Sequence, residues 1–167
     1  MIMHIATILK ILSMKLADSP AKRKFMEMLK KFLLGRVTHT ASDELLEDVQ
    51  FIKQMHAKHK NPDAVGLMLV SKALGHHTID HQDFIMESLT RVYREVVKQM
   101  YEYFGSSEAT NDPMSWRGVY ANIFESVMDS KAEQFVQQAA EHHGLNEVPE
   151  PEFWSQVTHE IEELTRT

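Results

Sequence analysis

Signals for the starts and stops of helices recur along this chain and constrain its fold more than any other feature. A good N-cap residue precedes a proline three times, at Ser19-Pro20, Asn61-Pro62 and Asp112-Pro113. Proline suits the first position of a helix, because the backbone N–H that it lacks would have no partner there. Four glycines follow runs of apolar periodicity, as left-handed residues do at helix ends, and they are Gly35, Gly75, Gly105 and Gly144.

Apolar residues between these signals recur at the three-to-four spacing of a helix with one buried face. Ile85, Leu89 and Val92 show this spacing clearly, and we find no comparable alternation of the kind that strands have. The expected helices span 2–17, 20–34, 41–60, 62–74, 79–104, 113–129, 131–143 and 151–165. We therefore predict an all-α, single-domain helical bundle of seven to eight helices covering residues 1–167.

The chain contains no cysteine, which rules out disulfides, thiolate zinc sites and thiol nucleophiles. This composition fits a reducing compartment, so we expect a cytoplasmic protein. The apolar N-terminus is interrupted by Lys10 and Lys15. It is also shorter than the roughly 20 apolar residues that span a bilayer, so we expect a core helix and no membrane span.

The charge is unevenly distributed. The net charge of −6 argues against a nucleic-acid-binding protein, because phosphate contacts need clustered basic residues. Residues 1–60 hold 11 Lys and Arg against 6 Asp and Glu, whereas residues 61–167 hold 7 against 18. Either the two halves attract each other within one fold, or Lys22, Arg23 and Lys24 belong to a basic face that binds an acidic partner or membrane surface.

Ten histidines are the most unusual part of the composition. His142 and His143 precede Gly144 at an expected helix end, where an imidazolium interacts favourably with the helix dipole, so we expect capping. His56 and His59 fall on an otherwise apolar stripe and are expected to point inward or at a groove.

Catalytic motifs are scarce. There is no glycine-rich phosphate loop, no Gly-x-Ser-x-Gly, no His-Glu-x-x-His and no Glu-x-x-His pair for a di-iron bundle. His77 and His81 lie one turn apart if their helix starts early, with Asp80 and Asp83 nearby, so a divalent metal site and a metal-dependent enzyme form one weaker hypothesis.

The stretch from Asn61 to Met128 resembles the proximal half of a globin. A helix ends at Leu74-Gly75-His76-His77, and after a corner a long helix ends at Gly105. Trp116 and Tyr120 then lie one turn apart in the following helix, with the spacing from the glycine that many bacterial globins have. The resemblance covers about 70 residues, and on it the residues after about 143 form an extra helix.

This resemblance implies a haem cofactor. It identifies His77, or else His76, as the proximal iron ligand, so that His77 is the expected metal ligand. It makes helix 41–60 the distal helix and places Gln50 or Phe51 near the bound gas. Haem also needs cations for its propionates, and Lys72, Arg91 and Arg94 are candidates.

The function implied by the resemblance is that of a haem-binding, globin-like carrier or sensor of oxygen or another gas, which is not an enzyme in the strict sense. The alternative is a non-enzymatic helical interaction or regulatory module. It would use a basic N-terminal hairpin at residues 20–36, with Lys22, Arg23 and Lys24 contacting a protein partner, and an acidic remainder. Neither hypothesis predicts an oligomeric state.

Overall fold

The computed structural model describes residues 19–38, 43–75, 81–145 and 150–165. Within these ranges the chain forms seven α-helices and no strand, which confirms the all-α prediction. The helices are α2 (Pro20–Thr38), α3 (Asp43–Ala57), α4 (Pro62–Leu74), α5 (Gln82–Phe104), α6 (Pro113–Ser130), α7 (Ala132–His142) and α8 (Glu150–Thr165). The expected helix at 2–17 lies outside the described residues.

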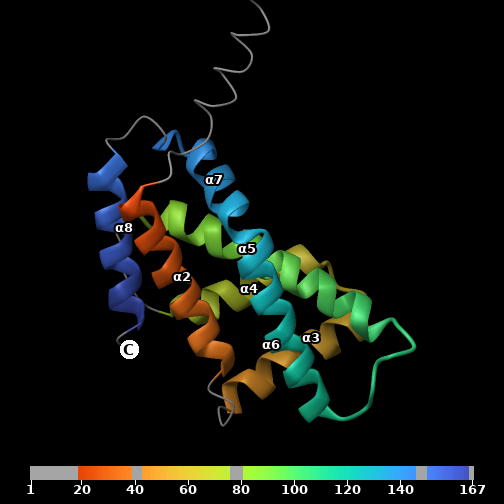
Figure 1. Ribbon diagram of the computed structural model, residues 1–167. Helices are drawn as coiled ribbons and strands as arrows, with labels where there is room; N and C mark the ends of the chain where they lie inside the picture. Colours follow the sequence, from red (N-terminus) through yellow and green to blue (C-terminus); the bar gives the residue numbers. More distant parts are fainter. Residues whose placement is uncertain (1–18, 39–42, 76–80, 146–149, 166–167) are drawn as a thin grey trace, which may run out of the picture.

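The long helix α5 is the centre of the arrangement. It contacts α3, α4, α6 and α7, and its most extensive contact is with α4. Helix α2 lies beside α8 on another side of the molecule and also contacts α6 (Figure 1). Within the described part of the chain, no helix has the length and apolar character that a membrane crossing requires.

Four aromatic side chains from three helices join the α2–α8 pair to α5. Phe25 of α2 lies 5.1 Å from Trp154 of α8 between ring centroids. Phe84 of α5 lies 5.2 Å from Phe153 of α8. All four rings are almost fully buried. Burial of a side chain of this size stabilises a fold by about 1.5–3 kcal/mol, so this cluster holds α8 against the rest of the bundle.

The predicted helix starts are confirmed by their hydrogen bonds. Asn61 Oδ1 accepts from the Asp63 backbone N–H at 2.8 Å, and Asp112 Oδ1 accepts from that of Met114 at 3.1 Å. Ser19 Oγ likewise accepts from the backbone N–H of Lys22 at 3.1 Å. Each cap satisfies a helix-terminal donor that the helix itself cannot pair.

The predicted helix ends are less accurate. Gly35 lies inside α2, which continues to Thr38, so the expected hairpin at 20–36 is one helix. A glycine costs about 1 kcal/mol in a helix interior, and burial of neighbours such as Phe32 and Leu33 outweighs that cost. Gly105 follows α5 but has a right-handed φ of −85°, whereas Gly75 and Gly144 do have positive φ, 61° and 66°.

Two other boundaries shift by a few residues. Helix α3 covers Asp43–Ala57 of the expected 41–60, and α5 begins at Gln82 where 79 was expected. His59 follows the end of α3 with φ 56°, in a left-handed conformation that stops the helix. His59 is exposed, so the expectation that it points inward is wrong, and the apolar stripe of α3 ends before this residue.

Candidate functional site

A groove lies between α3 and α4. Its volume is about 310 Å³, at the lower end of the roughly 300–1,000 Å³ that small-molecule sites occupy. Its lining comes from one face of each helix and consists of Glu47, Asp48, Phe51, Met68, Leu69 and Lys72. Both sets of residues have the spacing of neighbours on a helix surface, so the two helices form the opposite walls.

The walls of the groove are mainly apolar. Phe51 of α3 is half-buried and Leu69 of α4 is buried. Met68 is 53% exposed, although methionine side chains usually pack in the core. Exposed apolar surface at the mouth of a groove is typical of a binding surface.

Lys72 connects the two walls at the rim of the groove. Its Nζ lies 2.7 Å from Asp48 Oδ1 and 3.6 Å from Glu47 Oε2. Asp48 is 8% exposed, and its contact with Lys72 helps to compensate the charge of its carboxylate. The rim therefore holds a lysine ammonium oriented by carboxylate groups.

The predicted haem-site residues have different positions relative to this groove. Phe51 lines it, whereas Gln50 is exposed on α3 and is not among the described lining residues. His76 and His77 lie outside the described residues. They directly follow Gly75, whose backbone N–H donates to Ser71 O and ends α4.

His56 lies inward, as its stripe predicts, and contacts two aromatic rings of α5. The ring centroids of His56 and Tyr101 are 5.1 Å apart, and those of His56 and Phe104 are 6.0 Å apart. Burial lowers the pKa of His56, and the positive charges of Lys53 and His59 lower it further. Both effects favour the neutral form of the His56 imidazole over its protonated form.

His81, the other histidine of the expected metal pair, joins the start of α5 to α8. Its Nδ1 lies 3.2 Å from Glu160 Oε1, and its backbone N–H donates to the same oxygen at 3.2 Å. Asp83 is exposed beside it, while His77 and Asp80 lie outside the described residues. The described contacts of His81 are those of a link between helices.

Ion pairs connect the basic and acidic halves of the chain. Lys22 Nζ lies 2.8 Å from Glu133 Oε1, and Lys30 Nζ lies 2.6 Å from Asp129 Oδ1. Lys22 is only 5% exposed, so it belongs to the interior and not to an open basic face. Lys24 is exposed. For Lys22 and Lys30, attraction within one fold explains the uneven charge.

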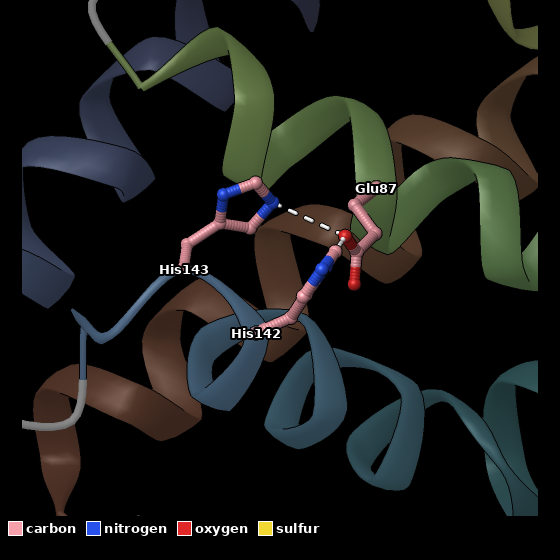
Figure 2. A group of neighbouring side chains, drawn as sticks. All are labelled: Glu87, His142 and His143. Carbon is pink, nitrogen blue, oxygen red and sulfur yellow. Dashed lines mark hydrogen bonds and ion pairs between the residues drawn. The ribbon is translucent and has the colours of Figure 1, made fainter.

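One side-chain cluster was missed by sequence reasoning. Glu87 of α5 is approached by both His142 and His143 at the end of α7 (Figure 2). His142 and Glu87 are 55 positions apart in the chain, so no local spacing could reveal the contact. The only available signal in the sequence is the His142-His143 pair itself, and from the sequence alone we interpret that pair as helix capping.

The charge on Glu87 is maintained by its neighbours. Burial acts to raise the pKa of this carboxyl group, but hydrogen bonds from His142 and Arg91, together with their positive charges, outweigh burial and lower it. Glu87 is therefore an ionised carboxylate at neutral pH, whose oxygens accept hydrogen bonds or bind a cation.

Comparison of the chain with models of known protein families, with curated proteins and with solved structures found no match in any of the three. Function has to be inferred from the residues and geometry of this chain.

Proposed function

We propose that this protein binds haem in the groove between α3 and α4 and carries or senses a gas. The observation that carries the proposal is the groove itself. It lies between the two helices that the globin resemblance identifies as the distal and proximal helices. Phe51, which the resemblance assigns to the gas-binding side, lines it.

The chemistry of the groove suits a flat apolar ring with carboxylates at one edge. Phe51 would pack against one face of the ring, and Met68 and Leu69 against the other. The Lys72 ammonium has three N–H donors, so it would pair with a propionate carboxylate while keeping its 2.7 Å contact with Asp48. Binding would also cover the exposed thioether of Met68.

The proximal ligand would come from the segment after α4. His77, or His76, is the ligand that the resemblance implies, and a neutral imidazole is a common axial ligand of haem iron. Haem would supply an iron with one open position for a diatomic gas. The role of the described residues is then to hold the ring, keep water from its faces and pair with its carboxylates.

Haemin titration of the full chain tests this proposal, with a Soret band at one equivalent as the expected result. Met68→Glu should weaken haemin binding by at least about tenfold, because it puts a charge in place of an apolar wall and, one turn before Lys72, competes with a propionate for that ammonium. Leu67→Glu is the matched control, since Leu67 is also exposed on α4, at 41%, but does not line the groove.

Two results would contradict the proposal. One is a wild-type protein that takes up no haemin, and the other is equal haemin affinity in the Met68→Glu and Leu67→Glu variants. In either case the better hypothesis is the interaction module, for which Lys24 offers an exposed charge on α2.

A further inference from the structure

We propose that Glu87, His142 and His143 form a binding site for a divalent transition-metal ion, with Zn²⁺ as the best fit. The site lies between α5 and the end of α7, and none of its residues lines the groove between α3 and α4. It is therefore independent of the haem proposal.

The three side chains present their ligand atoms to one point. One imidazole nitrogen from each of His142 and His143 and one carboxylate oxygen of Glu87 all lie within 4.8 Å of one another. His143 Nε2 is 3.1 Å from Glu87 Oε1, and His142 Nδ1 contacts the same oxygen (Figure 2). Ligand atoms about 2.0–2.1 Å from a tetrahedral Zn²⁺ lie roughly 3.3 Å apart, so small side-chain shifts complete this set.

The end of α7 explains how two consecutive histidines can face one partner. Successive residues within a helix point in different directions. Here His142 is the last residue of α7 and His143 is its C-cap, with φ −96° and ψ 7°, so the backbone leaves the helix between them. The left-handed Gly144, with φ 66°, completes the turn. The partial negative charge of a helix C-terminus also favours a bound cation.

Arg91 and Gln138 orient the carboxylate of Glu87. Arg91 Nε donates to Glu87 Oε2 at 3.0 Å, and another nitrogen of the same guanidinium donates to Gln138 Oε1 at 2.9 Å. The bond from Arg91 occupies Oε2 of Glu87, while Gln138 holds the guanidinium in place, so Oε1 is the oxygen that contacts the histidines. Partners of this kind fix ligand orientation in metal sites and affect metal affinity about 10–100-fold.

Two imidazoles and one carboxylate form a donor set that Zn²⁺ accepts, and three protein ligands leave a fourth tetrahedral position for water. The His142 side chain is 69% exposed, which gives the ion access from solvent. An ion at this site would fasten the end of α7 to α5, so it should raise the thermal stability of the protein.

The test is titration of the full, metal-free chain with Zn²⁺ at pH 7.5 in competition with a chromophoric chelator. We expect one equivalent to bind with micromolar or tighter affinity and to raise the melting temperature. His142→Gln and Glu87→Gln should each weaken this binding by at least about tenfold.

Matched variants separate this cluster from the other histidines. His159→Gln is the first control, because the His159 side chain is equally exposed, at 69%, and lies 3.9 Å from the Glu163 carboxylate. His77→Ala is the second, since it removes a histidine of the alternative metal site. Neither variant should change zinc affinity, and His142→Gln should leave haemin uptake unchanged.

The proposal is overturned if the wild type binds Zn²⁺ no more tightly than about 100 µM, or if His142→Gln binds it as tightly as His159→Gln. Either result would make the cluster an ion pair only. A second measurement does not depend on folding of the variants. Zinc should shift the imidazole NMR signals of His142 and His143 in the wild type, and unshifted signals would also reject the site.

Discussion

Gly66 of α4 lies directly against the backbone of Arg94 in α5. A Cβ atom at Gly66 would lie 3.0 Å from the Arg94 backbone nitrogen and 3.1 Å from its Cα. Only the absence of a side chain lets the two helices approach this closely. Because α4 forms one wall of the groove, this contact also positions Met68 and Leu69 relative to the core.

We predict that Gly66→Ala destabilises the protein. The Arg94 backbone lies inside the long helix α5 and cannot retreat alone, so overpacking should cost about 1–3 kcal/mol. Over most of its range this cost exceeds the gain of about 0.5–1 kcal/mol that alanine gives in a helix interior. Chemical denaturation of both proteins measures the difference.

Gly118→Ala is the matched control for this substitution. Gly118 is also helical, in α6, but nothing lies within 4 Å of a Cβ placed there. Alanine should therefore stabilise α6 by about 0.5–1 kcal/mol. If both variants shift stability in the same direction, the close approach of α4 and α5 is wrong.

We predict that His56 makes stability fall in mild acid. Burial is the main cause of its lowered pKa, so the folded state holds a proton on His56 less well than the unfolded chain does. Stability should therefore decline as pH falls below about 6.5, the unfolded pKa, and level off below the folded pKa. NMR titration of the imidazole should give a pKa below the ordinary value.

Lys53→Gln tests the causes of that shift. It removes a nearby positive charge that lowers the pKa of His56, but leaves the burial against Tyr101 and Phe104. The pKa of His56 should rise in this variant and still stay below its ordinary value. A full return to that value would mean that burial is not the main cause.

We predict that Lys22 matters for stability and Lys24 does not. Lys22→Ala removes a buried aliphatic stem and the 2.8 Å contact with Glu133, and it should cost about 1–2 kcal/mol. Lys24→Ala should stay within about 0.5 kcal/mol, because this lysine is exposed. Equal effects in urea denaturation would show that Lys22 is not part of the interior.

The parts of the fold that local chemistry determines could be predicted from sequence. Asn61 and Asp112 cap their helices through hydrogen bonds that span two residues, so a short window contains the whole signal. The sequence predicts a helix end at Gly35, but the helix continues through it. The burial of Phe32 and Leu33, which favours that continuation, depends on contacts with other helices. Local propensity gives way wherever tertiary packing is stronger.

The candidate sites needed tertiary information. The resemblance named Phe51, but only the packing of α3 beside α4 brings it opposite Met68 and Leu69. The contact of Glu87 with His142 joins residues 55 positions apart, at a helix end whose backbone direction no periodicity predicts. The burial of each candidate residue also depends on the packing of the helices. Gln50 and Phe51 are neighbours in sequence, but Gln50 is exposed and Phe51 is half-buried.

The proximal ligand gives the last prediction. If haem binds in the groove, the ferrous form should shift its Soret band with carbon monoxide, because a globin site leaves one iron position open. His77→Ala should weaken the haem complex far more than His142→Gln or His143→Gln. Those two histidines contact Glu87 of α5 and do not line the groove.

His76→Ala is the necessary companion variant. The resemblance assigns His77, or else His76, as the iron ligand, and a shift of one residue in the alignment would exchange their roles. One of the two variants should lose the carbon monoxide spectrum while the other keeps it. Both should fold like the wild type, since α4 ends at Leu74 and its cap uses the backbone of Gly75. If haem binds equally well without either imidazole, the proximal ligand assigned by the resemblance is wrong.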